Sequence, residues 1–104
     1  MQKSVVPYSM RLVSIVRSPN VAKKWRATFE KDDGRLKHTD FGANGMQDLT
    51  QHHDEERAER YRTRHAKDLK TNDPTRAGYL SYYILWASPS FRQNVQAFKN
   101  KFDL

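Results

Sequence analysis

Histidines and acids gather in the middle of the chain, where their spacing could support metal binding or proton transfer. His52 and Glu56 are four residues apart, which would place both on one face of a helix. The His-Glu-x-x-His pattern typical of helical zinc sites is absent from the sequence, and His65 falls several turns away. There is no cysteine to supply a thiolate ligand or nucleophile. We therefore expect no metal, no cofactor and no catalytic residue, and the protein is predicted to be non-enzymatic.

A cationic stripe runs along the same segment, residues 54–69, which is predicted to be helical. Its arginines recur at i, i+3 and i+7, and an aromatic residue and a histidine lie beside them. The stripe consists of Arg57, Arg60, Arg64, Tyr61 and His65. Because arginine forms two parallel hydrogen bonds with a carboxylate, we interpret these residues as a partner-binding surface or a buried polar network. The alternative is ordinary i, i+4 pairing with acids on a solvated helix face.

A second group of bases lies in the first part of the chain, where residues 1–41 hold nine Lys/Arg against four Asp/Glu. The candidates for a basic patch are Lys23, Lys24, Arg26, Lys31, Arg35 and Lys37. Such a patch could neutralise a phosphate backbone, so nucleic acid is a partner to consider. The alternation of residues 24–31 places Trp25 and Phe29 on the side opposite Lys24 and Arg26, which disfavours a base-stacking platform.

The whole chain of 104 residues has a net charge of +7 and a pI near 9.9. Only 37% of its residues are hydrophobic, and 30% are charged, so we expect one domain with a modest core. The basic balance favours a negatively charged partner. Lack of cysteine fits a reducing compartment. Residues 1–7 carry no apolar run typical of a signal peptide, and no stretch is long enough to cross a membrane.

The first half of the chain is predicted to form a sheet. We interpret residues 1–7 as a flexible arm and residues 8–17, rich in β-branched side chains, as a strand. Residues 24–31 alternate between apolar and charged side chains, which indicates a half-buried strand. An Asp-Gly turn precedes a returning strand over residues 36–41. A three-stranded antiparallel meander needs a helix on its apolar face to be stable.

The central helix is predicted over residues 73–86, with Asp73 as N-cap and Pro74 at the first helical position. Its aromatic residues follow at i, i+3, i+4 and i+7 and should lie on one face: Tyr79, Tyr82, Tyr83 and Trp86. Core packing is the main interpretation of this face, and a partly exposed interaction surface is the alternative. The segment is apolar nearly all round, so the rest of the domain should pack around it.

A last helix is predicted over residues 89–102, with Ser88 as its N-cap. Its apolar stripe, expected to be buried against the central helix, consists of Phe91, Val95, Phe98 and Phe102. The predicted fold class is thus α+β, a single domain over residues 8–104 in which a three-stranded antiparallel meander is followed by three helices.

Three runs of residues together resemble a known pattern over about residues 24–102. They are Phe41-Gly42-Ala43; then Asp48, Thr50, His53-Asp54-Glu55, Arg57, Arg60-Tyr61 and Arg64-His65; then Asp73-Pro74, Ala77-Gly78, Ser81 and Leu85-Trp86. The pattern is similar to an uncharacterised domain family of large nucleocytoplasmic DNA viruses of algae and protists. This chain has Met46 where an aromatic residue is usual and Tyr82 where a base is usual. The family has no assigned activity, so the resemblance implies a viral context and no residue roles.

Taken together, these features predict a small structural protein of a virion, a minor capsid or cement protein that binds larger capsid subunits. The resemblance implies its location, in the virion and, during assembly, in the host cytoplasm. The alternative is a basic nucleic-acid-binding protein that helps to package or compact viral DNA. A salt titration separates the two, because DNA binding weakens steeply with salt.

Overall fold

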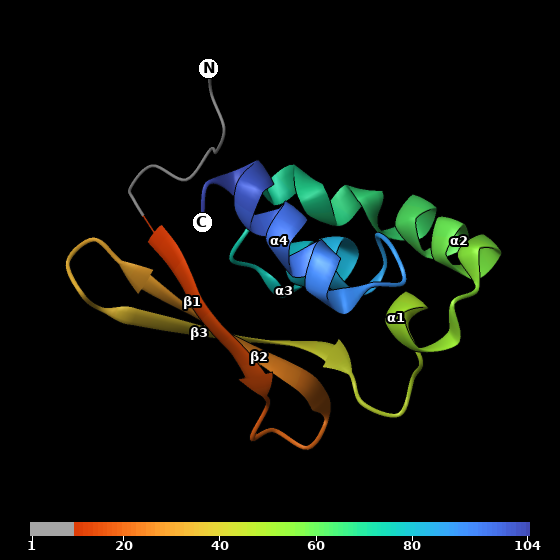
Figure 1. The fold of residues 1–104 in the computed structure, drawn as a ribbon, viewed down its shortest axis with the longest axis horizontal. Helices are drawn as coiled ribbons and strands as arrows, with labels where there is room; N and C mark the ends of the chain where they lie inside the picture. Colours follow the sequence, from red (N-terminus) through yellow and green to blue (C-terminus); the bar gives the residue numbers. More distant parts are fainter. Residues whose placement is uncertain (1–9) are drawn as a thin grey trace.

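The computed structural model describes residues 10–104, in which a three-stranded sheet is followed by a layer of helices (Figure 1). The antiparallel strands, in the spatial order β1-β2-β3, are β1 (Met10–Arg17), β2 (Lys23–Lys31) and β3 (Leu36–Ala43). The predicted meander and α+β class are therefore confirmed. The arm predicted for residues 1–7, and the first two residues of the predicted strand, lie outside the described residues.

The register of the sheet places its apolar side chains on the face that the helices cover. Leu12 of β1 pairs with Phe29 of β2, and Trp25 of β2 pairs with Phe41 of β3. Phe29 and Phe41 are fully buried, as is Ala27 between them, while Trp25 is half-buried against α4. The apolar residues of the second strand thus face the helices, as the alternation in the sequence predicts.

The helical layer contains more elements than the three that the sequence predicts. They are α1 (Leu49–His52), α2 (Glu55–His65), the 3₁₀ helix η1 (Ala66–Thr71), α3 (Ala77–Leu80), the π-helical turn η2 (Ser81–Leu85) and α4 (Phe91–Phe102). The short α1 was not predicted. Its N-cap is Asp48, whose side chain accepts from the backbone N–H of Thr50, while the Gln51 side chain accepts from the N–H of Asp48. Because the capping box stabilises this single helical turn, α1 forms without the repeating apolar pattern by which longer helices are predicted.

Asp73 is not the N-cap of the central helix, so that prediction is wrong. Its carboxylate accepts hydrogen bonds from the backbone N–H and the hydroxyl of Thr75, at 3.0 and 2.6 Å. Thr75 is also bound by β3, because Lys37 Nζ donates to its hydroxyl at 2.7 Å and the Thr39 hydroxyl donates to its carbonyl at 2.8 Å. These bonds hold residues 73–76 in a turn, and α3 begins only at Ala77.

The aromatic residues of the central segment do not share one face, which corrects a second prediction. Tyr79 and Tyr83 pack against Phe102 of α4 at ring-centroid distances of 5.7 and 5.3 Å. Trp86 instead stacks on Tyr61 of α2 at 4.2 Å. The π-helical turn η2, which contains Tyr83 and ends just before Trp86, is the physical reason, because i→i+5 bonding widens the turn and breaks the 3.6-residue period.

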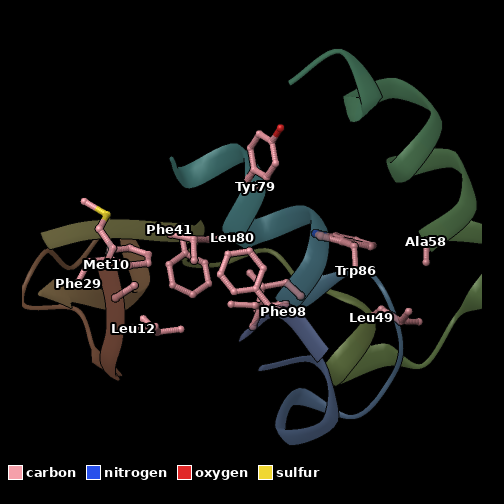
Figure 2. Close-up of a cluster of buried hydrophobic side chains, with 13 residues drawn as sticks. Met10, Leu12, Phe29, Phe41, Leu49, Ala58, Tyr79, Leu80, Trp86 and Phe98 are labelled. Atoms are coloured by element: carbon pink, nitrogen blue, oxygen red, sulfur yellow. The ribbon is translucent and has the colours of Figure 1, made fainter. Parts of the chain in front are cut away.

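The last helix packs its apolar stripe on the core as expected, although only its central phenylalanine is fully buried. Figure 2 shows Phe98 beside Leu80 on the helical side, close to the sheet residue Phe41. The exposed fraction of Phe98 is 1%, whereas Phe91, Val95 and Phe102 are partly buried against the same cluster. The helix begins two residues later than predicted.

Buried Asn94 explains where α4 begins. Its side-chain amide donates to the carbonyls of Ile84 and Ser88, both at 2.8 Å, and its side-chain oxygen accepts from the Ser88 hydroxyl. Ser88 is therefore engaged with Asn94, and Ser90 takes the N-cap position by accepting from the N–H of Gln93. Among the residues that the structure describes, no helix is both long and apolar enough to cross a membrane.

Candidate functional site

The arginine stripe lies on α2, a helix whose ends are both well satisfied. The Asp54 side chain caps its start by accepting from the N–H of Arg57 at 3.2 Å, and Glu55 and Glu56 occupy the first turn. Bases fill the last turn, as the helix dipole prefers. Ala58 is fully buried on the side that faces the core. The other sides of α2 can therefore present charged side chains.

Arg62 fixes α2 against the end of the central segment, a role that the sequence analysis missed. Its guanidinium donates to the carbonyl of Trp86 at 2.5 Å and to the carboxylate of Glu55 at 2.7 Å. The only sequence signal is the i, i+7 spacing of Glu55 and Arg62, two helical turns apart. That spacing gives no hint of the carbonyl of Trp86, 24 residues along the chain.

Four aromatic rings form a column that runs from the end of α2 to α1. His65 stacks on Tyr61 with a centroid distance of 4.1 Å, Tyr61 stacks on Trp86 at 4.2 Å with an interplanar angle of 8°, and Trp86 contacts His52 at 5.4 Å. Burial in this column raises the pKa of Tyr61, and the nearby charge of Asp68 adds to the effect. Both faces of the Tyr61 ring are covered by other side chains.

A cleft of about 290 Å³ opens beside this column, between α2, the end of the sheet and the central segment. The predicted site residues in its lining are Arg57, Tyr61, Arg64 and His65. The rest of the lining is Lys24, Gly42, Ala43, Met46, Gln47, Asp48, Ser81, Leu85 and Trp86. Arg60 is exposed and does not line the cleft, so the structure brings together four of the five predicted partner-binding residues.

Gly42 shapes the cleft where the sheet ends. Its φ is +82°, and an added Cβ would lie 2.9 Å from Cδ1 of Leu85 and 3.4 Å from Cβ of Lys24. A larger residue would therefore be strained by its backbone and would also collide with the central segment. The glycine in Phe41-Gly42-Ala43 lets β3 approach η2 closely enough to form one wall of the cleft.

Some charged side chains of the cleft have acidic partners, whereas others do not. Lys24 Nζ is 2.7 Å from a carboxylate oxygen of Asp48 and 2.6 Å from the Gln51 side-chain oxygen, so it is neutralised locally. His65 Nδ1 is 3.0 Å from the carboxylate of Asp68. Within residues 10–104, Arg57 and Arg64 have no ion-pair partner, because the ion pairs of α2 involve Arg62 and His65. These two guanidiniums are the uncompensated charges of the cleft.

The six predicted basic-patch residues do not form one continuous surface of unpaired charges. Arg26 makes a two-pronged contact with Asp40 at 2.8 and 3.1 Å, and this hydrogen bonding holds the pKa of Asp40 below its usual range. Arg35 pairs with Asp33, Lys37 binds Thr75, and Lys24 binds Asp48. Lys23 and Lys31 stand at opposite ends of β2. Nucleic-acid binding by this patch stays a prediction.

The histidines are placed without a ligand set for a metal. His52 Nδ1 accepts from the N–H of Asp54 at 2.8 Å, while its buried Nε2 has no hydrogen-bond partner among the described residues. In that same part of the chain, no three His, Asp or Glu side chains gather closely enough to hold a metal ion. In the cleft, the guanidiniums of Arg57 and Arg64 lie beside the aromatic side chains of Tyr61 and Trp86.

Comparison with family models identifies a match over residues 13–65, which covers the greater part of β1 and all of β2, β3, α1 and α2. The match includes Arg57, Tyr61, Arg64 and His65, and also Lys24 and Gly42 on the sheet side of the cleft. No curated protein and no solved structure matches the chain. The family model covers just over half of the chain and describes a family of unknown function, and we conclude that this chain belongs to that family, DUF5754.

Proposed function

We propose that this protein is a non-enzymatic binding protein whose cleft holds an acidic segment of a larger protein. One observation carries the proposal: Arg57 and Arg64, without ion-pair partners among residues 10–104, line the same cleft as the Tyr61–Trp86 stack. Two helical turns separate the arginines, which corresponds to about 10 Å along the helix axis. A partner with two carboxylates and an apolar side chain between them would satisfy both charges and cover the rings.

The geometry favours protein over nucleic acid as the partner. Nucleic-acid-binding proteins that use aromatic residues need an open ring face on which a base can stack. Here His65 and Trp86 cover the two faces of Tyr61, and His52 packs against Trp86. Several bases of the sheet are also engaged with carboxylates, which weakens them as a phosphate track.

The finer proposal is that the protein is a minor capsid or cement protein of a large DNA virus. Its support is the resemblance of the chain to a domain family of such viruses, together with a surface suited to larger subunits. In this proposal the protein resides in the virion and is present in the host cytoplasm during assembly.

The second candidate function is packaging or compaction of viral DNA, favoured by the net charge of +7. Fractionation of purified particles distinguishes the two functions. A cement protein should cosediment with the shell after the nucleoid is released, and its retention should depend on Arg57 and Arg64. Recovery with the nucleoid, with release by moderate salt, would replace the capsid proposal by the DNA-packaging one.

A further inference from the structure

We propose that the groove between β1 and α4 is a second docking site, which binds an extended acidic and apolar segment of a partner protein as an added strand. This site is separate from the cleft on α2, and the two have no lining residue in common. The inference goes beyond the proposed function, because one binding surface anchors a protein whereas two allow it to bridge neighbouring subunits.

The groove follows the backbone of an edge strand. In the part of the chain that the structure describes, β1 pairs only with β2, so its other edge carries no strand. Four consecutive residues, from Leu12 to Ile15, line the groove, and α4 supplies the opposite wall. A groove lined by consecutive strand residues brings an incoming chain within reach of the unpaired N–H and C=O groups of that strand.

Apolar side chains line the groove, which has a volume of about 370 Å³. Phe91 and Val95 of α4 face it and are only partly buried. The register of β1 shifts between Leu12 and Ser14, and the intervening Val13 is 52% exposed. Alternate side chains of an added strand would cover these residues, as happens when peptides extend a sheet.

The charge of the groove lining indicates which kind of chain the groove would bind. The ionisable residues that line the groove are Arg92 and Lys99, both bases. A second copy of this chain would bring a net charge of +7 against them, which disfavours self-association. A segment that alternates apolar and acidic residues would place one set of side chains in the groove and could pair its carboxylates with the two bases. We therefore assign an acidic partner segment to this groove.

The test uses a defined probe, a blocked peptide of alternating valine and glutamate, titrated into the isotope-labelled full-length protein. Amide chemical shifts should change along Leu12–Ile15 and α4. The double variant Arg92→Glu/Lys99→Glu should weaken binding by about tenfold or more, because it reverses the charge of the rim. The matched control Lys67→Glu/Lys70→Glu changes the net charge equally on exposed residues of η1 and should bind nearly as the native chain does.

Several results would overturn the proposal. Shifts confined to the α2 cleft would assign the probe to the first site, and equal weakening by the two variants would mean general charge attraction. Concentration-dependent self-association abolished by the groove variant would make a second copy the occupant. Binding that appears only after deletion of residues 1–9 would make that segment the occupant. No binding by the native or the shortened chain would also contradict the proposal, while the function proposed for Arg57 and Arg64 would be unaffected.

Discussion

Lys24 Nζ lies 2.7 Å from the carboxylate of Asp48, and the two side chains are only 11% and 4% exposed. This contact joins β2 to the start of α1 across 24 residues of sequence. Asp48 has two tasks, since one of its oxygens caps α1 and the other receives the lysine. The pair therefore fixes the floor of the cleft at the point where sheet and helices meet.

Removing this carboxylate should destabilise the domain strongly. Asp48→Ala leaves the largely buried ammonium of Lys24 without its carboxylate partner and removes the cap, and we expect a loss of about 3 kcal/mol in the free energy of unfolding. Chemical denaturation measures it. Glu30→Ala, at the more exposed pair with Arg11, is the matched control and should leave the denaturation midpoint nearly unchanged. Equal effects of the two variants would contradict a buried role for Asp48.

Alanine substitutions at the two glycines near the end of the sheet distinguish the cost of backbone strain from the cost of a steric clash. Gly42 and Gly45 both have positive φ, +82° and +92°, but only Gly42 has a side chain within 4 Å of an added Cβ. Gly45→Ala should cost about 1 kcal/mol from the backbone alone. Gly42→Ala should cost clearly more in the same denaturation experiment and should alter amide shifts around Leu85. The idea of close approach by η2 fails if the two losses are the same.

Truncation of the central phenylalanine of α4 tests the core. Phe98 is 1% exposed, so Phe98→Ala should lower the free energy of unfolding by about 3–5 kcal/mol. The exposed Gln96 on the same helix provides the control, because Gln96→Ala removes no buried contact. A loss below about 1 kcal/mol for Phe98→Ala, measured by chemical denaturation, would mean that α4 is not part of the core.

Buried and partly buried tyrosines should make the fold sensitive to high pH. Burial raises the pKa of Tyr61, Tyr79 and Tyr83 in the folded state, so their stabilising effect is fully present below about pH 10, the pKa of an unfolded tyrosine. As the pH rises above that value, the unfolded chain loses protons first and stability falls. Tyr61→Phe should reduce the slope of this fall. An unchanged slope would show that Tyr61 ionises equally in both states.

The sheet could be predicted from the sequence because neighbouring residues specify its strands and its hairpin turn. The alternation around Ala27 and the Asp-Gly turn specify strands and a hairpin without reference to distant residues. The central segment is different. Its start depends on bonds from Lys37 and Thr39 to Thr75, which lie 38 and 36 residues apart in the chain. Propensity favoured a helix from Pro74, and these long-range hydrogen bonds override it.

The candidate site was predicted in part for a similar reason. Helical spacing correctly grouped Arg57, Tyr61, Arg64 and His65, since these residues share one element. It also included Arg60, whose position on the helix points it outside the cleft lining. Lys24 was assigned to a basic surface, because only the tertiary structure brings the carboxylate of Asp48 to it.

The central claim is that Arg57 and Arg64 bind an acidic protein partner, and their paired replacement tests it most directly. The variant Arg57→Ala/Arg64→Ala is compared with Arg60→Ala/Lys67→Ala, which removes the same charge from exposed residues outside the cleft. Cosedimentation with purified, nucleoid-free shells gives the affinity of each chain. We predict a loss of about tenfold or more for the cleft variant alone, as for arginine anchors in interfaces. Equal shell binding by both variants, or a loss of duplex DNA binding specific to the cleft variant, would contradict the claim.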